Sequence, residues 1–102
     1  MKYRWTRAAD DDRLAIWHWN SNFGEVEANR VDRLIERAAE FISRSPFVGV
    51  TGRYRDTYEV PLGSNLRMIY EPRPDGVVIL AVLHAAFVLS DINDSRPPFK
   101  RY

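Results

Sequence analysis

A stripe of apolar residues at alternating spacings of three and four dominates the first half of the chain. This spacing places the side chains on one face of an α-helix, and charged residues occupy the positions between them. Pro46 closes the pattern because proline cannot continue a helix. The sequence therefore predicts a long amphipathic helix with one buried face. Its apolar positions are Ala28, Val31, Leu34, Ile35, Ala38, Phe41 and Ile42.

A second, shorter helix is predicted before this one. Thr6 is a typical helix N-cap, and Asp10–Asp12 follow it near the positive end of the helix dipole. Gly24 separates the two helices by a short connection, which favours an antiparallel helical hairpin. Ahead of the hairpin, residues 2–6 alternate polar and aromatic side chains and predict a short edge strand.

After Gly52 the period of the apolar residues changes to two, which is typical of β-strands. Strands are predicted over residues 53–62, 66–71 and 77–83, with turns between them. The last of these is continuously apolar, so we expect a central strand that is covered on both faces. The predicted fold is α+β in the order β-α-α-β-β-β, with a helical hairpin on an antiparallel three-stranded meander.

Composition sets the limits for this fold. The 102 residues, with 45% hydrophobic and 28% charged side chains, suit one soluble globular domain, which we place over residues 1–90. Residues 91–102 are polar with two prolines, and we expect them to form an arm or tail of the same domain. The chain has no cysteine, which excludes disulfides and thiol catalysis. It has neither a secretory signal nor an apolar run of ~18 residues, so a cytoplasmic protein without membrane contact is expected.

The charge pattern adds a restriction on partners. The net charge is only +1, which argues against a general polyanion binder. Two of the 15 basic residues, Lys2 and Lys100, are lysines, and the others are arginines. Arginine suits planar pairing with carboxylates, phosphates or aromatic rings.

In its motifs and their order, the chain resembles the RelE/ParE toxin family of bacterial toxin–antitoxin systems, from about Tyr3 to Phe87. The resemblance implies a family toxin that forms a hetero-oligomer with a cognate antitoxin protein. The motifs that carry it are the aromatic first strand before Thr6-Arg7-Ala8-Ala9-Asp10, Leu14-Ala15-Ile16-Trp17, Pro46 with Gly49, Gly52 and Arg53, Leu66-Arg67-Met68-Ile69-Tyr70, and Asp75-Gly76 running into the apolar strand that ends in His84.

The family resemblance implies one of two activities. RelE-like members are ribosome-dependent mRNA endonucleases that use basic residues on the sheet, whereas ParE-like members inhibit DNA gyrase. At positions where the nuclease branch keeps cations, this chain has Glu59, Pro61 and Phe87, and retains only Arg67. Scission of RNA needs a base, an acid and charge stabilisation at the phosphate. The sequence therefore favours a ParE-like gyrase inhibitor over an mRNA endonuclease, and an inactive antitoxin-binding module is a further alternative.

The candidate site residues follow from these alternatives, and they leave open whether the chain is an enzyme. For a nuclease, the catalytic candidates are Arg67 and His84. For a binding protein, the contacts expected to gyrase or antitoxin are Arg53, Arg55, Arg67 and Trp17. Each of these residues also has a structural explanation. The arginines can form an ion-pair ladder, His84 can be a packed residue, and Trp17 can belong to the core. We expect no cofactor and no metal site, because the two histidines lack the spacing of metal ligands.

Overall fold

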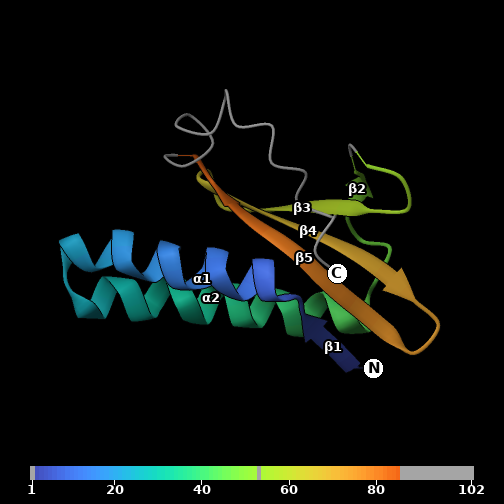
Figure 1. The fold of residues 1–102 in the computed structure, drawn as a ribbon, viewed down its shortest axis with the longest axis horizontal. Helices are drawn as coiled ribbons and strands as arrows, with labels where there is room; N and C mark the ends of the chain where they lie inside the picture. Colours follow the sequence, from blue (N-terminus) through green and yellow to red (C-terminus); the bar gives the residue numbers. More distant parts are fainter. Residues whose placement is uncertain (1, 53, 86–102) are drawn as a thin grey trace.

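The chain folds into two layers, a helical hairpin and a five-stranded β-sheet that the hairpin covers on one face (Figure 1). The computed structural model describes residues 2–52 and 54–85. Arg53, Phe87 and the predicted tail lie outside the described residues. The elements are β1 (Lys2–Trp5), α1 (Arg7–Asn20), the 3₁₀ turn η1 (Ser21–Phe23), α2 (Glu25–Arg44), β2 (Val50–Thr51), β3 (Tyr58–Leu62), β4 (Leu66–Arg73) and β5 (Gly76–His84).

The helical layer confirms the predicted hairpin. The hydroxyl of Thr6 accepts the N–H of Ala9 at 3.1 Å, so the N-cap of α1 is where the sequence places it. Gly24, with φ of +105°, makes the turn into α2 in a conformation that favours glycine. Helix α2 ends at Arg44, two residues before Pro46. Among the described residues, no helix is both long and apolar enough to cross a membrane.

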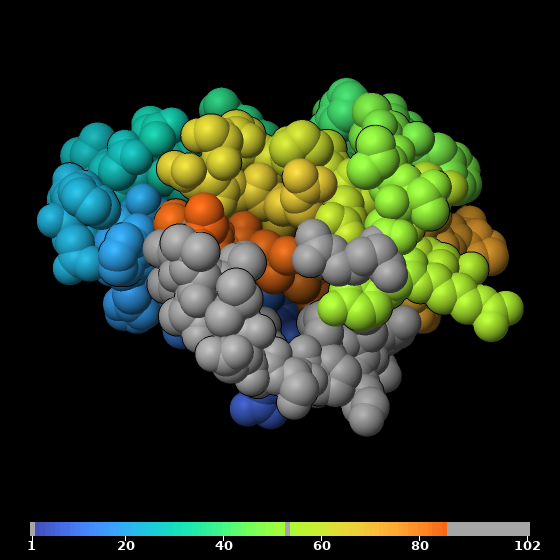
Figure 2. All heavy atoms as spheres, turned by 90° about the horizontal axis from the view of Figure 1, so that it is seen from above, coloured from blue at the N-terminus to red at the C-terminus, as the bar shows by residue number. Residues whose placement is uncertain are grey.

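The sheet has the strand order β1-β5-β4-β3-β2. Strands β3, β4 and β5 form the predicted antiparallel meander, while β1 pairs parallel to β5. Strand β5 is buried at every residue except Leu83, as its apolar sequence predicts. It lies second in the sheet, however, and β4 is the middle strand. The tip of the hairpin (blue) and the segment around β2 (light green) lie at opposite ends of the molecule (Figure 2).

Two groups of buried residues identify the two faces of the sheet. The face under the helices includes Met68, Tyr70 and Val82, which pack with the apolar stripe of α2. The other face has a smaller cluster of Ile69, Val78, Leu80 and Ala81. Leu80 and Ala81 are neighbours in the strand, yet both belong to this cluster, whereas neighbours in a regular strand point to opposite faces. The reason is a shift of the β4–β5 register at Ile69/Tyr70, as in a β-bulge.

The strand predicted over residues 53–62 is wrong over residues 54–57. Val50–Thr51 and Tyr58–Leu62 form separate strands, joined by a turn. In this turn the N–H and hydroxyl of Thr57 both donate to the carbonyl of Tyr54, at 3.2 and 2.7 Å. Asp56 adopts a left-handed conformation with φ of 62°. These local bonds compete with the strand ladder, which the alternating pattern alone does not reveal.

A second correction concerns the end of β4, which continues through Pro72 to Arg73 instead of ending at Glu71. Strand β3 begins at Tyr58, opposite Tyr70, so β4 has no partner from β3 at Pro72. A missing N–H is tolerated at such an edge, and the proline remains part of the strand.

Candidate functional site

The face of the sheet opposite the helices contains an ion pair between Glu59 of β3 and Arg67 of β4. Their closest nitrogen–oxygen distance is 3.6 Å, and the Glu59 side chain is only 5% exposed, against 42% for Arg67. The pair agrees with the structural explanation of Arg67 as a paired strand arginine, although Glu59 is buried and does not lie on an open sheet face. A buried carboxylate requires a counter-charge, and Arg67 supplies one from the neighbouring strand.

The two nuclease candidates, Arg67 and His84, lie on opposite faces of the sheet. Arg67 pairs with Leu83 across the β4–β5 ladder, whereas His84 pairs with Leu66. Cross-strand partners project to the same face. Leu66 belongs to the core under the helices, and Leu83 packs against the cluster on the other face. The structure therefore does not bring these two candidates together.

His84, the last residue of β5, is buried on the side of the sheet that faces the helical hairpin. Its ring contacts that of Trp19 edge to face, with 6.2 Å between the centroids. Burial lowers the pKa of the His84 imidazole below the ordinary value of 6.5, because the charged form loses hydration. Burial therefore favours the neutral form of the ring. The contact with Trp19 had no signal in the sequence, since 65 residues separate the two rings.

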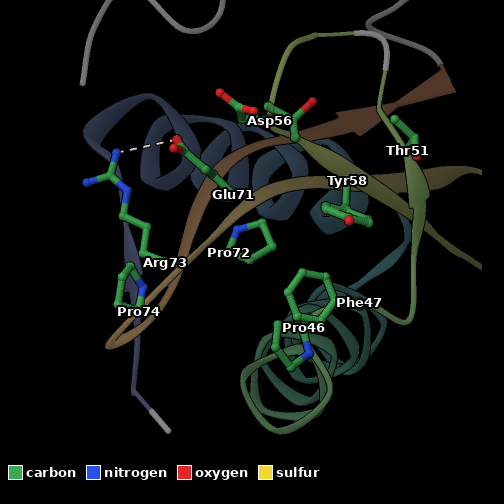
Figure 3. Close-up of a pocket in the computed structure, with 10 residues that line it drawn as sticks. Pro46, Phe47, Thr51, Asp56, Tyr58, Glu71, Pro72, Arg73 and Pro74 are labelled. Carbon is green, nitrogen blue, oxygen red and sulfur yellow. Dashed lines mark hydrogen bonds and ion pairs between the residues drawn. The ribbon is translucent and has the colours of Figure 1, made fainter.

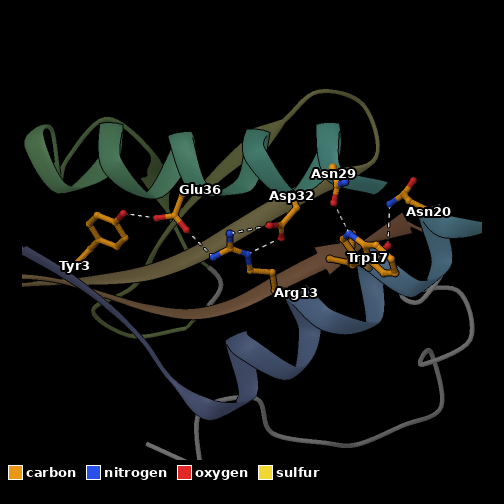
Figure 4. A network of polar contacts seen from close by, with 8 residues as sticks. Tyr3, Arg13, Trp17, Asn20, Asn29, Asp32 and Glu36 are labelled. Carbon is orange, nitrogen blue, oxygen red and sulfur yellow. Dashed lines mark hydrogen bonds and ion pairs between the residues drawn. The ribbon is translucent and has the colours of Figure 1, made fainter. Parts of the chain in front are cut away.

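The remaining predicted binding residues are spread over the molecule. Trp17 is half-buried between the helices, where its indole N–H donates to the side-chain oxygen of Asn29 at 2.9 Å (Figure 4). Trp19 is the more exposed of the two tryptophans. Arg55 lies on the turn between β2 and β3, with its side chain almost fully exposed, instead of on a strand face. Only Arg55 and Arg67 among the predicted arginines are described.

A polar network that sequence reasoning missed joins α1 to α2 and β1 (Figure 4). Arg13 donates two hydrogen bonds to Asp32, at 2.7 and 3.0 Å, and forms an ion pair with Glu36 at 2.7 Å. Its guanidinium also lies 4.8 Å from the centroid of the Trp5 ring. The Tyr3 hydroxyl donates to Glu36, which raises the pKa of Tyr3 to about 12 and lowers that of Glu36. This network joins the helical hairpin to β1, the edge strand of the sheet.

A hollow of about 780 Å³ lies at the β2 end of the sheet, where three separate segments meet (Figure 3). Its walls are largely apolar, and the rings of Phe47 and Tyr58 are 5.5 Å apart. Rigid prolines and aromatic rings of this kind can receive an apolar side chain of a partner. The remaining lining residues are Pro46, Thr51, Asp56, Thr57, Glu71, Pro72, Arg73 and Pro74. Across residues 2–52 and 54–85, no three acidic or imidazole side chains gather to hold a metal ion.

Comparison with known families identifies the chain. Residues 3–88 match the family model described as the ParE toxin of the type II toxin-antitoxin system parDE. The chain belongs to the ParE toxin family. This assignment confirms the family that the sequence motifs indicate, and the protein is a toxin of the type II toxin–antitoxin class.

Two solved structures share the ParE-family fold seen here. The chromosomal ParDE system from P. aeruginosa superposes with a TM-score of 0.74 at 17% identity, covering 82% of this chain and 95% of that chain. The toxin–antitoxin complex RelBE2 from Mycobacterium tuberculosis gives a TM-score of 0.62 at 24% identity, covering 81% and 95%. At these identities the likeness concerns the fold, and it confirms the predicted α+β architecture. No curated protein matches the chain.

Proposed function

We propose that this toxin acts by binding and inhibiting DNA gyrase and does not cleave RNA. The observation that carries the proposal is the separation of the nuclease candidates. Arg67 is paired with a buried carboxylate on one face of the sheet, and His84 is packed under the helices on the other. Acid–base catalysis requires both groups within hydrogen-bonding reach of one substrate.

Electrostatics supports the same conclusion. A phosphodiester that approached Arg67 would meet the Glu59 carboxylate 3.6 Å from the guanidinium nitrogen. That carboxylate competes for the same N–H groups and repels a second anion. His84 lies on the opposite face of the sheet and adds no cation to this one. The face is therefore poorly suited to hold the developing charge of RNA scission, which nucleases stabilise with unpaired cations.

The target contacts we propose are Arg55, Arg67, Trp17 and, outside the described residues, Arg53. Arg55 is the best placed of these, because its almost fully exposed side chain projects from a turn. Arg67 is partly exposed, and its planar guanidinium can contact a polar or aromatic group of a partner. In the cytoplasm, a cognate antitoxin neutralises the toxin by forming a hetero-oligomeric complex with it. The toxin acts on gyrase when it is free of the antitoxin. The two neighbouring structures, which are toxin–antitoxin systems, support this part of the proposal.

The decisive experiment is controlled induction of the toxin with two readouts in the same cells. A DNA-damage reporter detects gyrase poisoning, and primer extension on translated mRNA detects ribosome-dependent cleavage. We expect DNA-damage signalling without mRNA cuts, and inhibition of supercoiling by purified gyrase. Codon-phased cleavage without DNA damage would overturn the proposal in favour of an endonuclease. Absence of both effects would also overturn it and indicate an inactive antitoxin-binding module.

The residue assignments need a separate test on purified gyrase. Arg55→Ala removes an exposed cation with little structural involvement, and we expect weaker inhibition of supercoiling at an unchanged melting temperature. Arg4→Ala is the matched control, since Arg4 is an exposed arginine on β1. Equal inhibition by Arg55→Ala and the control would remove Arg55 from the target interface. Arg67→Lys keeps the charge beside Glu59 and tests the planar guanidinium separately.

A further inference from the structure

The connection between α2 and β3 exposes a group of large apolar side chains around β2. Phe47 and Val50 are 68% and 64% exposed, and Val48 and Tyr54 are exposed as well. Within the described part of the chain, β2 is an edge strand of the sheet. Soluble proteins seldom leave clustered apolar side chains open to water, and such clusters usually mark a surface that binds a partner. We call these apolar residues, together with Arg55, the β2 tip.

Cations border the apolar part of the β2 tip. Arg44, the last residue of α2, and Arg55, on the turn before β3, are both exposed. The contact of Arg55 with the neighbouring Asp56 is 3.9 Å long and lies in solvent, so it neutralises Arg55 only weakly. In the sequence, residues 44–56 contain Arg44, Arg53 and Arg55 against one acidic residue, Asp56, so three positive charges minus one leave +2. This charge complements an acidic surface of a partner.

Hydrogen bonds hold the backbone of the β2 tip in place, although its side chains are exposed. The N–H of Gly49 donates to the hydroxyl of Tyr70 at 3.1 Å, and the Tyr70 side chain is fully buried in the core. The N–H of Gly52 donates to the carbonyl of Thr57 at 2.7 Å, and the bonds from Thr57 to the Tyr54 carbonyl close the turn. A surface that is already ordered loses little conformational entropy on binding. The β2 tip is therefore preorganised for a partner.

The apolar hollow at this end of the sheet adjoins the β2 tip. Phe47 and Asp56 both line it, and Asp56 follows Arg55 directly in the chain (Figure 3). An apolar side chain of a partner that enters the hollow contacts the rings of Phe47 and Tyr58. A carboxylate beside it on the partner then pairs with the Arg55 guanidinium. Arginines and aromatic rings are the side chains that contribute most binding energy at protein interfaces.

We propose that the β2 tip is the surface through which the toxin binds its target, and that the target presents an apolar side chain next to a carboxylate. The inference rests on the proposed function, which makes this target gyrase. It adds the apolar anchors Phe47, Val48 and Val50 to the contact already assigned to Arg55. A nucleic acid fits this surface less well, because the valines are aliphatic and cannot stack on bases.

The test measures inhibition of supercoiling by purified gyrase with full-length toxin variants. Phe47→Ser and Val50→Ser each remove an exposed apolar side chain from the β2 tip. Val26→Ser is the matched control, since Val26 is 82% exposed and lies on the second residue of α2, beside the tip of the helical hairpin. We expect the toxin concentration for half-maximal inhibition to rise about tenfold for Phe47→Ser, less for Val50→Ser, and not at all for the control. Melting temperatures check the fold of each variant, and Val50→Ser decides the test if Phe47→Ser does not fold.

The charge of the facing group is tested at Arg55. If that group is a carboxylate, Arg55→Glu should weaken inhibition more than Arg55→Ala, because it adds repulsion to the lost attraction. Equal effects of the two variants would overturn the proposed carboxylate.

The outcomes separate this inference from the proposed function. If the wild type inhibits gyrase and both serine variants of the β2 tip inhibit it equally well, the inference is overturned and the proposed function stands. If the wild type does not inhibit gyrase, both are overturned. Serine variants that inhibit gyrase like the wild type but escape neutralisation on co-expression with the antitoxin would assign the β2 tip to the antitoxin and also overturn the inference.

Discussion

Replacing Arg13 with methionine should destabilise the protein far more than the same change at Arg30. Both arginines form bidentate pairs with a carboxylate at 2.7–3.0 Å. Arg30, however, pairs within one exposed turn of α2, while Arg13 joins α1 to Asp32 and Glu36 of α2. Methionine retains most of the aliphatic stem, so the comparison isolates the charge that links the helices.

The expected loss follows from the contacts of Arg13. A hydrogen bond to a charged group contributes about 1.5–3 kcal/mol when it is well shielded, and Arg13 has such bonds to two carboxylates. Asp32 and Glu36 are 34% and 40% exposed, so solvent screens much of this energy. Adding about 0.5–1 kcal/mol for the contact with the Trp5 ring, we expect the free energy of unfolding to fall by about 2–3 kcal/mol.

Urea denaturation of wild type, Arg13→Met and Arg30→Met at several pH values provides the assay. The pKa of Glu36 is lowered in the folded state, by the Tyr3 hydroxyl first and then by Arg13. Its stabilisation is therefore present above the ordinary pKa of 4.5 and is lost as pH falls below it. The difference in the free energy of unfolding between wild type and Arg13→Met should therefore become smaller below pH 4.5. Equal losses for the two variants at pH 7 would refute the reasoning.

Three further predictions test the core, a close approach and a buried ring. Ile35→Ala, at a fully buried position on α2, should cost about 2–5 kcal/mol in chemical denaturation, and a loss under 1 kcal/mol would contradict the assigned core. Gly49→Ala places a Cβ 2.6 Å from the carbonyl oxygen of Glu59 and should lower the free energy of unfolding by about 1–3 kcal/mol. A variant as stable as the wild type would show that the two backbone segments are farther apart. NMR titration should give His84 a pKa below 6.5, and stability should decline as pH falls through that value because the unfolded chain binds the proton more readily. A normal or raised pKa would contradict its burial.

The fold was predictable wherever the signal was local. The apolar stripe of α2, the Thr6 cap and the apolar run of β5 each depend on residues close in sequence. The cap and the burial of β5 appear as predicted. The stripe is wrong at two positions, because α2 buries most of its other apolar residues on the sheet and leaves Leu34 and Phe41 exposed. The error over residues 54–57 has a local cause as well. There, hydrogen bonds from Thr57 to Tyr54 outweigh an alternating pattern that looks like a strand.

The candidate site was less predictable because its geometry depends on strand register. A shift of one residue between β4 and β5 would turn one strand's side chains to the opposite face, and Arg67 and His84 would then share a face. The apolar pattern of β5 gives no guidance on register, since both faces of that strand are buried. The paired Glu59 is a similar case, because its burial depends on β3 lying beside β4.

By itself, the sequence determined the helical hairpin, the meander and the toxin family, because periodicity and motif order are carried by neighbouring residues. Only the tertiary structure decided which charges are neutralised and which remain free. Arg13 and Arg67 are paired with carboxylates brought from other elements, whereas the exposed Arg37 and Arg44 have no carboxylate partner in the part of the chain that the structure describes. Pairing energy depends on distances between segments far apart in the chain, and those distances arise only when the layers pack.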